Sequence, residues 1–166
     1  VWVRGYLAGY SSTADYNTAV GSSSFKTNTT GKTNTAVGRA ALYANTVGAS
    51  NTSVGMNSMV SNTSGAYNTA LGVQALNSNT TASNNTAVGY QAGYSNAVSS
   101  NNTSLGYQAA YSNTAGINNV AVGMQAMNAN TSGSYNEAVG YQTLYSLTTG
   151  SNNTAIGYQS GYYVTT

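Results

Sequence analysis

Side chains that could carry out acid–base or nucleophilic chemistry are scarce in this sequence. The 166 residues include no His and no Cys, and the side-chain carboxylates are Asp15 and Glu137 alone. His and Cys are the commonest sources of a general base, a thiolate nucleophile or a zinc ligand. The many Ser and Thr hydroxyls therefore have no base to activate them. We expect no catalytic residue, no metal site and no cofactor, and we predict that the protein is not an enzyme.

Tyrosine is the residue type best suited to recognition. The chain has 15 tyrosines, and a flat ring with a polar tip can contact sugars or apolar receptors. The alternative is that the rings stack on one another along a regular structure and act as struts, which is expected wherever a repeat places the same aromatic residue. The candidate receptor contacts recur at two fixed places: Tyr90, Tyr94, Tyr107, Tyr111, Tyr141, Tyr145, Tyr158 and Tyr162.

These tyrosines follow a phrase that returns every 17 residues. The third residue of the phrase is always Ala or Ser, the fourth is Val, Leu or Ile, and the fifth is Gly. Nine copies follow one another without insertion or deletion, which is typical of a repeat architecture. The phrase opens with Asn in every copy: Asn17, Asn34, Asn51, Asn68, Asn85, Asn102, Asn119, Asn136 and Asn153.

The repeat unit predicts an all-β fold. Seventeen residues are too few for two helices and their turns, and helical repeats are about 33 residues or longer. Thr, Val and Tyr favour strands, whereas Gly and Asn favour turns, so we interpret each unit as strand, turn, strand, turn. We predict a parallel β-solenoid, or β-roll, of nine 17-residue coils over residues 17–166. Residues 1–16 form an irregular partial repeat or cap. At ~4.8 Å per coil, the nine coils would extend about 43 Å.

In such a stack each residue lies on its counterpart in the next coil. The nine Asn residues therefore predict an amide ladder that meets buried backbone groups. A Gln column predicts a second ladder: Gln74, Gln91, Gln108, Gln125, Gln142 and Gln159. Asp15 and Glu137 fall seven coils apart, roughly 34 Å at this spacing, so they cannot act as a catalytic pair.

The two columns that follow the Asn–Thr pair lie on opposite faces of a strand. One column is Ala or Ser and the other is aliphatic, and both are free of charge, so both faces are expected to be buried. A single coil has only one interior, and the second face therefore needs a partner. We expect two to four chains, most simply three, to associate around an axis with this strand innermost. The partner is thus the chain itself, as a homotrimer or a longer filament.

The core phrase resembles the head repeats of trimeric autotransporter adhesins, which form a left-handed parallel β-roll. The matching residues are NTAVG at 17–21, 34–38 and 85–89, NTALG at 68–72 and NTAIG at 153–157. The variants are NTSVG at 51–55, NTSLG at 102–106, NVAVG at 119–123 and NEAVG at 136–140. The resemblance covers residues 17–166, although the adhesin heads repeat over a shorter period.

The longer phrase NTAVGYQA at 85–92 is similar to repeats in phage tail fibres and bacterial surface fibres. Both resemblances imply a shaft or head segment of a trimeric fibre that attaches to a host or surface. They also imply an extracellular, cell-surface or virion location. A cell-surface glycan or protein is the receptor implied.

A second class of function is an ice-binding or self-assembling matrix filament, because stacked Thr columns present ordered hydroxyls and methyls. One column shares a strand face with the aliphatic residues and is expected to be buried with them: Thr18, Thr35, Thr52, Thr69, Thr86, Thr103 and Thr154. The other follows the second Asn column: Thr29, Thr46, Thr63, Thr80, Thr114, Thr131 and Thr148.

The low charge content bears on which classes of partner the chain can bind. Charged residues make up 4% of the chain, against about 25% in typical domains, so little charge repulsion opposes self-association. The net charge is +2, and no basic stripe runs along the repeats, so we expect no nucleic-acid partner. No apolar run approaches the roughly 20 residues needed to span a membrane, and we expect no membrane insertion of this segment.

Overall fold

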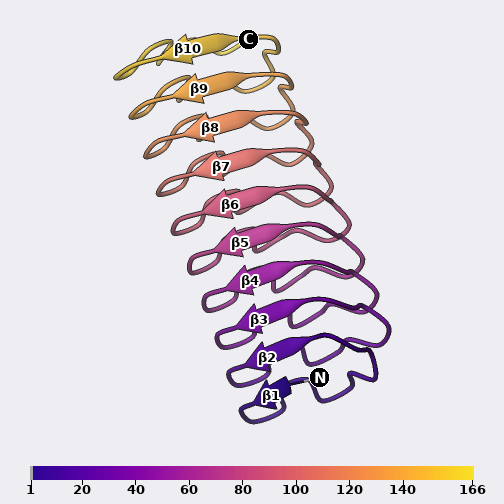
Figure 1. The fold of residues 1–166 in the computed structure, drawn as a ribbon. Coiled ribbons are helices and arrows are strands. Elements are labelled where there is room, and N and C mark those ends of the chain that lie inside the picture. The colour runs from indigo at the N-terminus through magenta and orange to yellow at the C-terminus, as the bar shows by residue number, and fades with distance from the viewer. Residues whose placement is uncertain (1) are drawn as a thin grey trace.

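The computed structural model describes residues 2–166, which form a rod of stacked coils with the two chain ends at opposite ends of the rod (Figure 1). Each coil contributes one strand of three residues, and the ten strands form a single parallel sheet in sequence order. The strands are β1 (Trp2–Arg4), β2 (Thr18–Val20), β3 (Thr35–Val37), β4 (Thr52–Val54), β5 (Thr69–Leu71), β6 (Thr86–Val88), β7 (Thr103–Leu105), β8 (Val120–Val122), β9 (Glu137–Val139) and β10 (Thr154–Ile156). The all-β solenoid predicted from the 17-residue period is therefore confirmed.

The register of the sheet follows the repeat. Ala19 pairs with Ala36, and Val20 pairs with Val37, so equivalent residues of successive coils lie side by side. The first coil is one residue shorter, because Trp2 of β1 pairs with Thr18 of β2. Strand β1 lies within residues 1–16 and continues the same sheet.

The expectation of two strands in every coil was wrong. After each strand the chain makes turns, and alternate residues there adopt a positive φ, for example Gln74 at 58° and Leu76 at 48°. Positive φ on alternate residues prevents an extended strand. The backbone still bonds between coils, because the N–H of Leu76 donates to the carbonyl oxygen of Ala92 at 3.0 Å. Stacking thus satisfies the main chain without a second sheet.

Glycine directly after each strand is required by close packing between coils. Gly38 has φ +127°, and a Cβ there would lie 2.6 Å from the carbonyl oxygen of Gly55 in the next coil. Any side chain would collide with backbone as well as adopt a disfavoured conformation. This explains why the fifth residue of the phrase is Gly in all nine copies.

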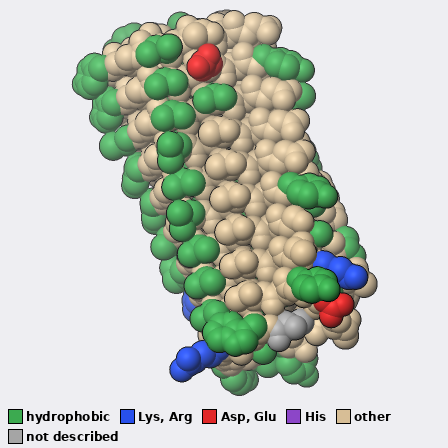
Figure 2. Space-filling model, in the orientation of Figure 1, with side chains coloured by type: hydrophobic (Ala, Val, Ile, Leu, Met, Phe, Trp, Pro, Cys, Tyr) green, Lys and Arg blue, Asp and Glu red, His purple; other side chains and the backbone are tan. Residues whose placement is uncertain are grey.

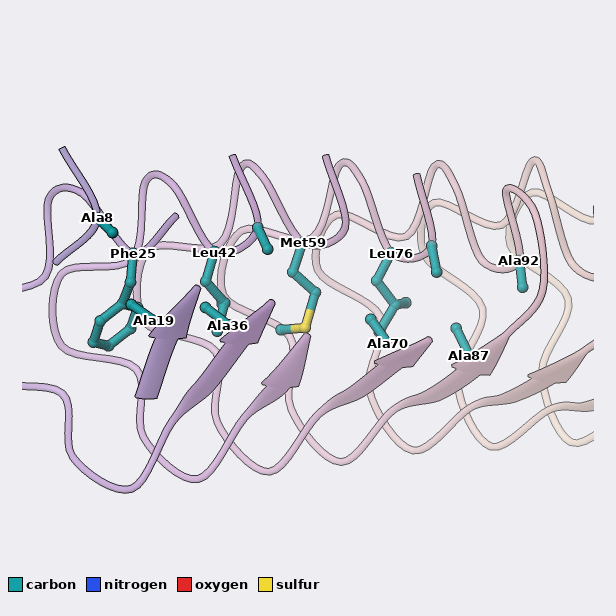
Figure 3. Close-up of a cluster of buried hydrophobic side chains, with 12 residues drawn as sticks. Ala8, Ala19, Phe25, Ala36, Leu42, Met59, Ala70, Leu76, Ala87 and Ala92 are labelled. Carbon is teal, nitrogen blue, oxygen red and sulfur yellow. The ribbon is translucent and has the colours of Figure 1, made fainter. Parts of the chain in front are cut away.

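The core is a narrow strip between the strand and the turns opposite it. The small middle residue of each strand, such as Ala36 or Ala70, points inward and meets a larger side chain from the turns, such as Leu42 or Leu76 (Figure 3). These side chains are completely or almost completely buried. The core comprises one cluster that ends at Ala92 and a second that begins at Ala109.

Candidate functional site

The first asparagine column is bonded throughout the rod and is buried from Asn17 to Asn136, with Asn153 half-buried at the C-terminal end. The backbone N–H of Asn34 donates to Oδ1 of Asn17 at 2.8 Å, and Nδ2 of Asn34 donates to the carbonyl oxygen of Gly48 at 2.9 Å. The same backbone-to-Oδ1 bond recurs at each later member, up to Asn153 and Asn136 at 3.0 Å. The column forms an amide ladder that serves backbone groups in the interior and presents nothing to a ligand.

A second asparagine ladder runs through the turns and contains a break. Nδ2 of Asn62 donates to Oδ1 of Asn45 at 2.7 Å, and Asn79 donates to Asn62 at the same distance. The next rung is missing, because the buried Oδ1 of Asn79 and the buried Nδ2 of Asn96 have no partner. The hydroxyl of Ser99 instead bonds with Oδ1 of Asn96. Ser99 occupies a position that is Gly in six other coils.

The glutamine column forms a third ladder, which lies at the surface. From Gln91 to Gln159, Nε2 of each Gln donates to Oε1 of the Gln in the preceding coil at 2.9–3.2 Å, and Gln74 begins the ladder as an acceptor. Each amide uses one donor in this way. A second N–H of each side chain is left over for solvent or a ligand.

The candidate receptor tyrosines stack in pairs one coil apart. The pairs are Tyr90–Tyr107, Tyr94–Tyr111, Tyr141–Tyr158 and Tyr145–Tyr162, with ring centroids 5.0–5.5 Å apart and planes within 14° of parallel. Within each pair the two rings cover one face of each other. The ring edges and hydroxyl groups are therefore the main contacts that these tyrosines offer to another molecule.

The outer face of the sheet carries the aliphatic column. Val20, Val37 and their equivalents point away from the core, and Leu71 and Leu105 remain 48% and 44% exposed. The side chains form a continuous row along the rod (Figure 2). The single chain therefore leaves this face open, in line with the expectation that its burial needs a partner. The chain itself supplies nothing to cover this face, and association with a partner stays a prediction.

The first threonine column lies on the same outer face and is not buried. Thr52, Thr69 and Thr86 are exposed, and within residues 2–166 the hydroxyls of this column make no hydrogen bond with the protein. The second column differs, because each of its hydroxyls donates to a backbone carbonyl of the next coil at 2.8–3.1 Å.

The two carboxylates are far apart. Asp15 precedes β2 and Glu137 lies in β9, so seven strand-to-strand steps separate them. Over residues 2–166, no group of three or more acidic, His or Cys side chains gathers in a form that could hold a metal ion. The described part of the chain also contains no helix long and apolar enough to cross a membrane.

Sequence reasoning did not anticipate the break in the second asparagine ladder. Two substitutions in one coil mark the place: Ala97 stands in the Thr column, and Ser99 stands in the Gly column.

Comparison with family models, curated proteins and solved structures finds no match to this chain.

Proposed function

We propose that this chain is a structural and adhesive segment, a shaft or head, of an extracellular or virion fibre that attaches to a host or surface. The observation that carries the proposal is the exposed aliphatic row on the outer face of the sheet, which extends from β2 to β10. The row includes Leu71, Leu105 and Ile156, which are 48%, 44% and 66% exposed. A continuous apolar surface of this kind marks an interaction site.

A second copy of the chain fits this face best. The row is straight, repeats in step with the coils and carries few charges, so parallel copies would bring identical columns together. Nine coils at ~4.8 Å give an interface about 43 Å long. We propose a homotrimer, or a longer filament, in which the outer faces of the strands surround the common axis.

Adhesion would come from many weak contacts repeated along the rod. The stacked tyrosines offer hydroxyl groups and ring edges beside the free N–H groups of the glutamine ladder, a chemistry suited to a glycan or a polar protein surface. Repetition of such contacts raises the overall affinity through avidity.

An ice-binding or matrix filament is a second candidate, favoured by the first threonine column. Its hydroxyls are exposed and unbonded, and they lie beside the aliphatic row on a regular sheet. This function needs the outer face to stay open, whereas a trimer covers it. The two candidates therefore make opposite predictions about the same face.

Measurement of molar mass in solution separates them. We expect the purified protein to have the mass of three chains, and the Leu71→Ser, Leu105→Ser variant to have the mass of one. A matched control is Val47→Ser, which removes an exposed aliphatic side chain from another side of the rod and should leave the trimer intact. A single-chain mass for the unmodified protein, accompanied by thermal hysteresis and ice shaping, would reject the trimer and favour the second candidate.

A further inference from the structure

The stacked tyrosines make a chemical modification possible that the adhesive function does not require. We propose that the four tyrosine pairs are sites of oxidative cross-linking, in which a carbon–carbon bond joins the rings of successive coils as dityrosine. The pairs are those described above: Tyr90–Tyr107, Tyr94–Tyr111, Tyr141–Tyr158 and Tyr145–Tyr162. The co-reactant is a peroxide used by a one-electron oxidant of the haem peroxidase class.

The geometry brings the reacting atoms together before any bond forms. In each pair the centroids are 5.0–5.5 Å apart and the rings are nearly parallel. The χ2 torsion of Tyr is broad and roughly two-fold. Opposite χ2 rotations of the two rings swing one ortho carbon of each ring toward the other, while the coils stay in place. Two radicals formed on such a pair are therefore neighbours from the start.

The reaction balances within one pair and one peroxide. Each phenol gives up one electron and its hydroxyl proton and becomes a tyrosyl radical. The two radicals join through a bond between one ortho carbon of each ring, and the two ortho hydrogens then move to the oxygens and restore both phenols. Hydrogen peroxide accepts the two electrons and two protons, its O–O bond breaks, and two water molecules form.

The sequence offers no competing covalent link between coils. There is no Cys in the chain, so neither a disulfide nor a thiol consumes the oxidant. The pairs that follow the strand glycine, Tyr90–Tyr107 and Tyr141–Tyr158, are exposed, whereas Tyr94, Tyr111 and their equivalents are half-buried. We therefore expect the exposed pairs to react first.

Other tyrosines in the same chain provide a matched control. Tyr16, Tyr67 and Tyr135 are well exposed, Tyr16 at 79% against 45% for Tyr90, yet their counterparts in the next coil are Thr33, Asn84 and Asn152. If exposure alone governed coupling, these three would react alongside the other highly exposed tyrosines. If stacking governs it, they remain unmodified at low protein concentration.

The experiment treats the dilute full chain with hydrogen peroxide and a haem peroxidase, and follows dityrosine fluorescence and intact mass under denaturing conditions. We expect a single-chain product that has lost two hydrogen atoms per link. Digestion with a protease of broad specificity and mass spectrometry should map the links to residues 17 apart.

Two variants test the assignment. Phe keeps the stacked ring and removes the phenol, so Tyr90→Phe with Tyr141→Phe should abolish the fast phase of fluorescence, with the circular dichroism spectrum unchanged. The triple variant Tyr16→Phe, Tyr67→Phe, Tyr135→Phe should react as the unmodified chain does. The proposal is overturned if links map to the three isolated tyrosines, if the rate depends on protein concentration, or if no dityrosine forms while N-acetyltyrosine in the same vessel couples.

Discussion

Two neighbouring stretches of the rod have the same repeat but differ in the second asparagine ladder and in how the core is filled. In residues 51–84 the second asparagine ladder is continuous, and Leu or Met fills the core opposite the strand. In residues 85–101 the ladder is interrupted at Asn96, the core position holds Gly93, and Ser99 replaces the ladder's Gly. The two core clusters also separate here, between Ala92 and Ala109.

The difference indicates that the ladder is sensitive to the residue three positions after each Asn, which is Gly65 after Asn62, Ala82 after Asn79 and Ser99 after Asn96. A Cβ on Gly65 would lie 2.5 Å from Oδ1 of Asn62 and 2.2 Å from the carbonyl oxygen of Ala82. Where Ser99 occupies the equivalent place, its hydroxyl takes Oδ1 of Asn96, and Nδ2 of Asn113 bonds with Oγ of Ser99 in place of that oxygen, so the rung between Asn113 and Asn96 is lost. Identity of the stacked residue is therefore not sufficient, because the amide also needs room from its neighbour.

The largest expected effect comes from removing one amide in each stretch. Asn62 donates to Asn45 and to the carbonyl of Gly65, and it accepts from Asn79, so Asn62→Ala leaves several buried groups without partners. Each such group costs about 1–3 kcal/mol, and we expect a loss of about 4 kcal/mol in the free energy of unfolding. Asn96→Ala removes only the bond with Ser99 and should cost at least about 2 kcal/mol less.

Urea denaturation followed by circular dichroism measures both variants. Equal losses for Asn62→Ala and Asn96→Ala would contradict the idea that the ladder is weaker at Asn96.

A smaller loss of stability is expected when serine, as found at Ser99, replaces the equivalent Gly65. Gly65→Ser should reproduce the interruption between Asn62 and Asn79 and destabilise the chain by about 1–3 kcal/mol through crowding. The control is Ala66→Ser at the next residue, a position where Ser83 and Ser100 occur naturally, with an expected change within about 0.5 kcal/mol. The midpoint of thermal unfolding provides the comparison, and a Gly65→Ser chain as stable as its control would show that crowding is not the cause.

The smallest effect is expected at the core position that Gly93 occupies. Gly93 has φ +59°, and a new Cβ would meet Cδ2 of Leu76 at 3.0 Å, but Ala110 holds the same position in the next coil with φ 49°. Gly93→Ala should therefore destabilise the chain by only about 1 kcal/mol, the lower end of the cost of a left-handed residue that carries a Cβ. Gly89→Ala in the same coil should be far more damaging, because its Cβ would lie 2.5 Å from the carbonyl oxygen of Gly106. Hydrogen exchange of the amides in residues 85–106 would show whether the two glycines differ in this way.

The period of the sequence was sufficient to predict the coil, the parallel sheet and its register. Asn17 and its equivalents recur without a gap, and only stacking in register gives such a column a reason to stay constant. The glutamine ladder followed from the same argument. These features depend on the identity and spacing of the repeated residues, and both can be read directly from the sequence.

What the sequence did not reveal depends on backbone torsions and on small differences between coils. The residue types of Gln74 and Leu76 do not indicate a positive φ, because this conformation is uncommon for residues other than Gly, Asn and Asp. The aliphatic column faces outward, as expected for a face that needs a partner, and its burial by other chains stays a prediction. The receptor-contact role of the tyrosines remains a prediction, since stacking explains their spacing equally well.

The contact between successive strand glycines has a consequence for how such a gene can change. Because Gly38 and Gly55 touch through their backbones, a single added or lost residue between them would shift every column beyond it. Removal or addition of a whole 17-residue unit, in contrast, keeps each residue paired with its equivalent in the next coil. The length of the rod is thus free to vary over generations, but only in steps of one coil.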